Sequence, residues 1–439
     1  MKKYMESLCY VIFLGVVLLF PGQLAGREDS RPITLRTMGS LFFGGTVTHA
    51  KDGDTFHGDH GYAQFYIPQK SRDYPVILWH GIGQSGRSWE STPDGREGYQ
   101  AILPRRGWAT YIIDQPRRGR AGYTQVSPSG SGDVPTTARE SSAWNAFRNG
   151  VWVPPAPASL FAGSQFPGDA ASIEQFFRQQ APNTGDEPRT DEHRRFMGET
   201  MAALLERTGP AVLVTHSNSG QYGWFTGMIA PDKVGAIVAY EPGQFVFPDD
   251  EPMLDVPFKN ALAGELLQGI PVPAREFQKL TRMPILVVYG DNISTELSDV
   301  FNVEVWRISR ARARAFVEAV NRHGGDATLL VLPEEGIMGN THAPFADRNN
   351  LDIADMLEDW LHEKGLDGSA HPHTGPAPAK RTELTIPLLE SRALPVFGTE
   401  HSLPFRDGRY AGRAFPEGTF VIVQAFPTRV DPSAFLPDE

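Results

Sequence analysis

The segment AVLVTHSNSG, residues 211–220, decides which fold this sequence favours. Its apolar start leads into Thr-His-Ser-Asn-Ser-Gly, which is typical of a buried strand that turns sharply at Ser217. A tight strand–turn–helix with an exposed serine at its corner normally reads Gly-x-Ser-x-Gly, because strand and helix pass so close that only small side chains fit. Thr215 and Ser219 stand at the two glycine positions, and both are small, so the segment predicts this turn.

Other segments of the chain share the apolar, β-branched character of this strand. They are short and apolar on both faces, which is typical of strands in a buried parallel sheet. The strand-like segments are residues 74–81, 107–114, 211–217, 234–241, 283–290 and 327–334. Helical patterns with glycine at their ends lie between or after them, at 192–209, 309–325 and 349–365. The alternation predicts an α/β fold with a doubly wound, mostly parallel sheet.

The expected organisation has three parts. Residues 1–26 combine two early lysines, an apolar run of roughly 13 residues and a small-residue end, which predicts a secretory signal peptide and a secreted or periplasmic protein. The apolar run is shorter than the roughly 20 residues that span a bilayer, so no membrane span is expected in the mature chain. Residues 27–365 form the expected α/β domain, and 366–439 form a linker and a C-terminal extension of unknown role.

Two insertions interrupt the strand–helix alternation, at about 122–190 and 244–281. Both are loop-rich, the first carries many aromatic residues, and both leave the carboxyl ends of strands, where α/β sheets place their sites. They are therefore expected either to cap a binding pocket or to pack as extra helices on the body of the domain.

Composition excludes several classes of function. The 439 residues carry a formal net charge of −11, so the surface repels nucleic-acid phosphates. The single cysteine, Cys9, lies in the signal segment, which leaves the mature chain without a cysteine nucleophile, disulfide or thiolate metal site. The Asp- and His-rich segment 50–61 fits no metal-ligand pattern and is interpreted as a polar hairpin loop between the strand-like segments 40–49 and 61–68. We expect no metal and no cofactor, and the oligomeric state stays open.

Several polar residues follow the predicted strands. His80-Gly81 ends one strand, and the backbone N–H of Ile82 or Gly83 would there pair with that of Asn218 to bind an oxyanion. His342 follows the last strand and is the expected base. His216 neighbours Ser217, but adjacent strand residues point to opposite faces, so it is interpreted as a packing residue.

Two carboxylates compete for the role of partner to His342. Glu241 ends an otherwise apolar strand, where a buried charge is costly unless it has a partner such as an imidazole. Asp291 comes one residue after Gly290, a position better suited to bracing a turn. The sequence favours Glu241 and leaves Asp291 as the alternative.

These motifs together resemble the α/β-hydrolase superfamily, and within it the secreted bacterial carboxylesterases whose catalytic acid follows strand six. The matching segments, among them WHG, VTHSNSGQY, AIVAYEPGQ and GNTHAPFADRNN, fall within residues 38–365. The resemblance implies a Ser217–His342–Glu241 triad that hydrolyses small-molecule carboxylic esters through an acyl-enzyme, without a cofactor. Thr215, Ser219 and the long second insertion depart from the pattern. Two alternatives stay open: a non-catalytic binding protein of this fold, and the same triad acting on lactone, polyester or peptide bonds.

Overall fold

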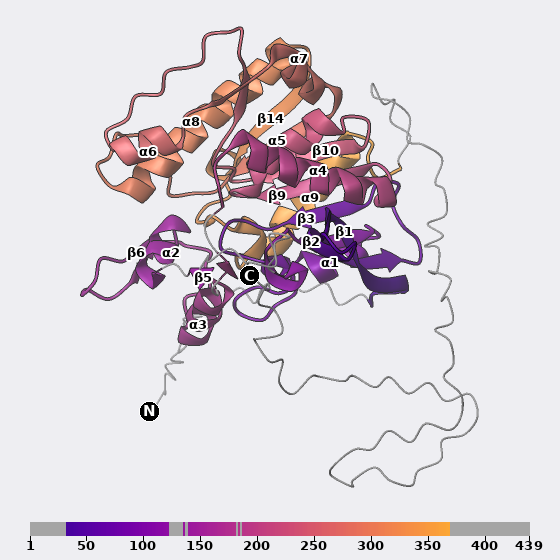
Figure 1. The fold of residues 1–439 in the computed structure, drawn as a ribbon. Coiled ribbons are helices and arrows are strands. Elements are labelled where there is room, and N and C mark those ends of the chain that lie inside the picture. Colours follow the sequence, from indigo (N-terminus) through magenta and orange to yellow (C-terminus); the bar gives the residue numbers. More distant parts are fainter. Residues whose placement is uncertain (1–31, 123–134, 137–138, 181–182, 185–186, 369–439) are drawn as a thin grey trace, which may run out of the picture. The chain divides into compact units, whose positions relative to one another are not determined.

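The computed structural model describes residues 32–122, 135–136, 139–180, 183–184 and 187–368 (Figure 1). All of them belong to one of the two compact units of the chain, Met1–Leu384. The predicted signal peptide and residues 369–439 of the predicted C-terminal extension lie outside the described residues. Among the residues described, no helix is long and apolar enough to cross a membrane.

An eight-stranded sheet organises the described part of the chain. Its strands, in spatial order, are β1 (Leu35–His49), β2 (Thr55–Pro68), β4 (Thr110–Asp114), β3 (Val76–Trp79), β9 (Ala211–His216), β10 (Val234–Tyr240), β13 (Pro284–Tyr289) and β14 (Asp326–Val331). The β1–β2 and β2–β4 pairs are antiparallel, and all later neighbours are parallel. This confirms the predicted doubly wound, mostly parallel sheet.

Helices cover both faces of this sheet. The helices are α1 (Tyr99–Arg105), α2 (Glu140–Ala146), α3 (Ala170–Gln179), α4 (Asp191–Thr208), α5 (Ser219–Ile229), α6 (Ala261–Leu266), α7 (Ala274–Phe277), α8 (Phe301–Arg322) and α9 (Asn350–Glu363). Helices α4, α5 and α8 contribute to the core on one face, and α1 and α9 to the core on the other. Both faces of the central strands are therefore buried, which explains why these strands are apolar throughout.

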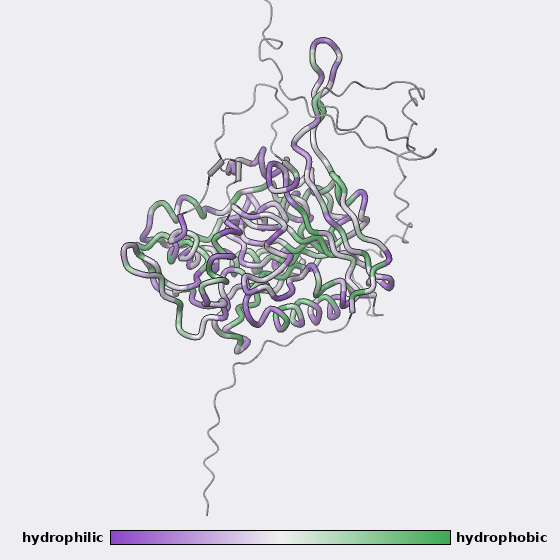
Figure 2. The backbone as a smooth tube through the Cα atoms, turned by 90° about the horizontal axis from the view of Figure 1, so that it is seen from below, coloured by the Kyte–Doolittle hydropathy of each residue, from purple (hydrophilic) through white to green (hydrophobic). Residues whose placement is uncertain are grey.

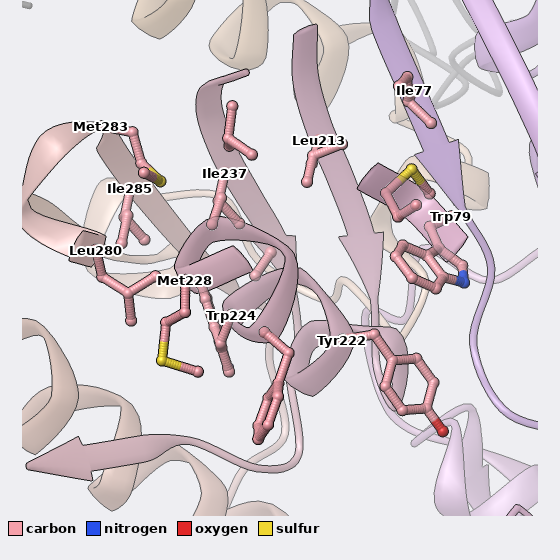
Figure 3. Packing of buried hydrophobic residues seen from close by; sticks show 14 of the residues in the cluster. Ile77, Trp79, Leu213, Tyr222, Trp224, Met228, Ile237, Leu280, Met283 and Ile285 are labelled. Atoms are coloured by element: carbon pink, nitrogen blue, oxygen red, sulfur yellow. The ribbon is translucent and has the colours of Figure 1, made fainter. Parts of the chain in front are cut away.

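Alternating strand residues supply these two cores. Figure 3 shows side chains of β3, β9, β10 and β13 packed against α5 and the segment after α7. The labelled members are Ile77, Trp79, Leu213, Tyr222, Trp224, Met228, Ile237, Leu280, Met283 and Ile285. Each fully buried large apolar side chain stabilises the fold by about 1.5–3 kcal/mol. In Figure 2 the hydrophobic segments likewise gather along the strands in the interior.

The hairpin of β1 and β2 is longer than the sequence indicates. The predicted loop at 50–61 shrinks to a tip closed by the Ala50 N–H, which donates to the Asp54 carbonyl at 2.8 Å. From Thr55 onward the chain is already strand, since backbone pairing such as Val47 with His57 continues through these polar residues. No group of three or more potential metal ligands occurs among the described residues.

The two insertions begin at the carboxyl ends of β4 and β10. The first carries α2, α3 and the short pairs β5 (Pro135–Thr136) with β8 (Asn183–Thr184) and β6 (Gly150–Val151) with β7 (Ser159–Leu160). The second carries α6, α7 and the pair β11 (Val246–Pro248) with β12 (Ile270–Val272). In Figure 1, α2, α3 and α6 all lie to the left of the central strands.

Candidate active site

Ser217 occupies a strained corner between β9 and α5. Its φ is +55°, a left-handed backbone conformation that L-residues rarely adopt. Its N–H donates to the Tyr240 carbonyl at 2.9 Å, which ties the corner to the end of the neighbouring strand β10. Strain of this kind persists where the surrounding structure holds it, and here it turns the serine out of the sheet.

The space that glycines normally leave at this corner is provided elsewhere. A Cβ on Gly223 would lie 3.0 Å from Thr215 Cγ2, so the threonine methyl fills the room left by a glycine on α5. Ser219 is fully buried, and its hydroxyl accepts a hydrogen bond from the His216 N–H at 2.9 Å. Strand and helix therefore pass closely although neither of the two usual glycines is present.

Glu241 and His342 form a buried pair beside this corner. Glu241 directly follows β10 with a φ of +52°, and its Oε2 lies 2.8 Å from His342 Nδ1. A carboxylate can only accept, so Nδ1 carries the proton and Nε2 is left with a free lone pair. His342 lies on the loop before α9, and its backbone N–H donates to the Phe147 carbonyl at 2.8 Å.

An arginine that the sequence did not reveal completes the environment of Glu241. Arg148 Nη1 and Nη2 donate to the two carboxylate oxygens at 2.7 and 2.5 Å, and the Gly290 N–H donates to Oε1 at 2.5 Å. Burial alone raises the pKa of Glu241, but Arg148 and His342 outweigh it and hold the pKa at about 2. The carboxylate is therefore ionised throughout the working pH range.

His342 is enclosed by aromatic rings. The centroids of Trp306, His216 and Phe147 lie 4.2, 4.6 and 5.0 Å from that of its imidazole. Burial lowers the pKa of His342, and although Glu241 opposes this shift, Arg148 adds to it. The imidazole is therefore neutral at neutral pH, the state in which it can accept a proton.

His216 is buried, as its interpretation as a packing residue requires, but it also forms hydrogen bonds. Its Nε2 lies 2.9 Å from the His342 carbonyl, and the Gln84 side-chain amide contacts its Nδ1 at 3.1 Å. Burial places the pKa of His216 well below its ordinary value. His216 is thus a neutral hydrogen-bonding group, and its bond to the His342 carbonyl stabilises the loop that carries His342.

Asp291 braces a turn and does not meet His342 among the contacts of the described residues. Its Oδ2 accepts from the Gly339 N–H at 2.7 Å, and its Oδ1 accepts from the Asn292 N–H at 2.6 Å. Of the two candidate acids, the one that the structure brings to the imidazole is Glu241.

Ser217 and His342 open into one cavity of about 200 Å³. The rest of its lining is mainly apolar and comes from both insertions and α8: Ala146, Phe147, Leu266, Leu267, Phe301, Val305 and Trp306 are among these residues. Ile82 and Asn218 also line it, and the hydrogen bonds of the described residues include none donated by either backbone N–H. Gly83 lies outside the lining, so Ile82 is the better placed of the two oxyanion candidates.

A second buried carboxylate, that of Glu187, lies behind Asn218. Its Oε2 accepts from Asn218 Nδ2 and from the Tyr222 hydroxyl, both at 2.6 Å, and its Oε1 accepts from Gln115 Nε2 at 2.8 Å. The network joins the first insertion to the residue after the serine. Glu187 is separated from these three partners by 31 to 72 positions in the sequence, and no local pattern signals the network.

The sheet order, the serine corner and the carboxylate–imidazole pair define an α/β-hydrolase, and the chain belongs to that superfamily. It is similar to a solved structure described as "The Atomic Resolution Structure of a Novel Bacterial Esterase", with 29% identity and a TM-score of 0.61 over 77% of this chain and 98% of that one. It is also 27% identical over 336 residues to the "Probable secreted lipase phiG" of Fungal sp. (strain ATCC 74256), a match covering 69% of this chain and 86% of the relative. No family model matches the chain.

Proposed function

We propose that this protein is a serine carboxylesterase that uses Ser217 as nucleophile, His342 as general base and Glu241 as the acid that orients His342. The observation that carries the proposal is the 2.8 Å contact between Glu241 and His342 Nδ1, with Ser217 on a left-handed corner of the same cavity. The names of the two relatives, an esterase and a lipase, agree with ester hydrolysis.

Acylation begins at the free Nε2 of His342. This nitrogen takes the hydroxyl proton while Ser217 Oγ attacks the ester carbonyl carbon. The carbonyl oxygen becomes an oxyanion, which the N–H groups of Ile82 and Asn218 would bind. Removing one such donor typically costs about 3–4 kcal/mol of transition-state stabilisation. His342 then gives its proton to the leaving alcohol, and the acyl group stays on Ser217.

Deacylation repeats the same steps with water. His342 takes a proton from water, the resulting nucleophile attacks the acyl-enzyme, and Ser217 leaves with the proton that His342 returns. Glu241 stabilises the imidazolium in both halves and stays ionised, as its low pKa requires. No cofactor enters any step of this proposal.

The test combines turnover with labelling. We expect the mature protein to hydrolyse p-nitrophenyl acetate and to be labelled by a fluorophosphonate probe at Ser217. We expect Ser217→Ala to lose the labelling and almost all turnover. Equal rates in the two proteins would refute the assignment, and a folded wild type that neither turns over nor labels would favour a non-catalytic binding protein. Lactones, polyesters and peptides tested in parallel decide which bond is preferred.

The location of the protein is part of the proposal. We infer a secreted or periplasmic enzyme from the signal-like pattern of residues 1–26, and the curated relative is called secreted. N-terminal sequencing of the exported protein tests this inference. A chain that is found only in the cytoplasm with its first residues intact would contradict it.

A further inference from the structure

We propose that Arg148 is a positioning residue for the catalytic acid: its guanidinium fixes the Glu241 carboxylate toward His342, and its charge sets the pH range in which His342 acts as a base. This inference rests on the proposed function. It assigns a role in the reaction to a residue of the first insertion that does not itself line the cavity.

The contact geometry is that of a clamp. Both Nη atoms of Arg148 reach the two oxygens of Glu241, at 2.7 and 2.5 Å, in the paired arrangement that fixes carboxylate orientation most strongly. The third guanidinium nitrogen, Nε, donates its N–H to the Asp291 carbonyl at 2.9 Å. The arginine side chain is only 5% exposed, and that of Glu241 is 0% exposed, so water does not compete for these bonds.

The backbone around Arg148 holds the base as well as the acid. Phe147 accepts the His342 N–H at 2.8 Å, while Arg148, with a φ of +53°, turns its own side chain to Glu241. The Arg148 guanidinium carbon lies 5.2 Å from the centre of the Trp306 ring, which also contacts His342. The dipeptide 147–148 therefore contacts both members of the pair.

The charge of Arg148 also affects the base directly. An isolated carboxylate next to an imidazole strongly favours the protonated ring, whereas a carboxylate already neutralised by a guanidinium favours it less. Arg148 accordingly lowers the pKa of His342, in the same direction as burial. Among the described residues, other titratable or charged groups face Arg148 or the pair from β9, β13, α8 and the loop before α9. They are His216, Tyr289, Arg310 and Asp347.

Two substitutions separate charge from geometry. Arg148→Lys keeps the positive charge but cannot contact both carboxylate oxygens and the Asp291 carbonyl together. Arg148→Met removes the charge and keeps much of the side-chain length. The matched control is Arg106→Met, because Arg106 is a similarly buried arginine that pairs with Asp355 and Glu358 between α1 and α9, away from the cavity.

The readout is the pH dependence of kcat/KM for p-nitrophenyl acetate, together with the pH dependence of fluorophosphonate labelling of Ser217. We expect Arg148→Met to move the acid limb of both profiles upward by about one pH unit, the lower end of the effect of a neighbouring charge. We expect Arg148→Lys to keep the limb in place while kcat falls at least tenfold and KM stays within twofold. Arg106→Met should lower the melting temperature without moving the limb.

The outcomes are distinguishable. An unmoved limb in Arg148→Met, or wild-type kcat in Arg148→Lys, refutes the role of Arg148 while the proposed function stands. If Arg148→Met does not fold, the Arg148→Lys variant alone decides. A shifted acid limb or an unchanged kcat in that variant refutes the role of Arg148, and an unshifted limb with a reduced kcat supports it. Absence of labelling at Ser217 in the wild type refutes the proposed function itself.

Discussion

Replacing Glu241 by glutamine changes one atom and should remove nearly all turnover. The carboxylate accepts four hydrogen bonds, from the Gly290 N–H, two Arg148 nitrogens and His342 Nδ1. A glutamine has one carbonyl oxygen, so its NH₂ group meets a donor in either orientation. Arg148 cannot give up a proton, but His342 can change tautomer. The amide nitrogen therefore takes the Oε2 position, and Nδ1 becomes the acceptor.

The wrong tautomer explains the expected size of the effect. With its proton on Nε2, His342 has no lone pair for the Ser217 hydroxyl. The same amide replacement in a serine protease triad lowers kcat about 10⁴-fold, which corresponds to about 5.4 kcal/mol in activation free energy at roughly 1.36 kcal/mol per tenfold. The substitution also leaves Arg148 buried without its countercharge, which destabilises a fold by about 3–5 kcal/mol.

The assay must separate turnover from folding. We would measure kcat for p-nitrophenyl acetate at a temperature where circular dichroism shows each variant folded. Asp291→Asn is the matched control, since within the described part of the chain the Asp291 side chain accepts only from the backbone N–H groups of Gly339 and Asn292. We expect it to lower stability by about 1–3 kcal/mol and to change kcat less than tenfold. A folded Glu241→Gln variant within tenfold of wild type, or a larger loss in Asp291→Asn, would refute the reasoning.

Three further predictions concern the supports of the site. Glu187→Ala should destabilise the fold by about 1–3 kcal/mol for each donor left unpaired, which lowers the melting temperature. It should also reduce kcat by displacing Asn218; an unchanged melting temperature and kcat would contradict this. Burial raises the pKa of Asp347 to about 7, above roughly 3.9 in an unfolded chain. Its protonated form is therefore the stabilising one, and wild-type stability relative to Asp347→Asn should fall as pH rises from 4 to 7; parallel melting curves would argue against it. Gly223→Ala should cost about 1–3 kcal/mol in urea unfolding through contact with Thr215, and adding Thr215→Ser should recover most of this loss; strictly additive effects would exclude the contact.

The sequence indicated the sheet well because its central strands are covered on both faces. A continuous apolar run is the direct consequence of such burial, and the segments at 211–217 and 234–241 are confirmed as β9 and β10 almost residue for residue. The hairpin of β1 and β2 is longer than the loop predicted at 50–61 allowed. Its strands pair through backbone groups, and polar side chains such as that of His57 do not prevent this pairing.

The site was predictable to the extent that it lies at strand ends. Ser217 and Glu241 follow apolar runs directly, and His342 follows the last strand, so position alone suggested them as a group. Arg148 and Glu187 lie in an insertion without periodicity. Their contacts with Glu241 and Asn218 span 93 and 31 positions, and no local pattern encodes them. Only the folded chain shows that Arg148 supplies the countercharge of the buried Glu241 carboxylate and that Glu187 accepts a hydrogen bond from Asn218.

The contacts of Phe147 and Arg148 have a consequence for protein engineering. Exchanging the first insertion for that of another hydrolase is an obvious way to graft a new substrate range onto this scaffold. Such a chimera would lose the main-chain acceptor of His342 and the counterion of Glu241 in the same step. A graft must therefore retain residues 147–148, or else remodel the pocket through the second insertion and the wall formed by Val305 and Trp306.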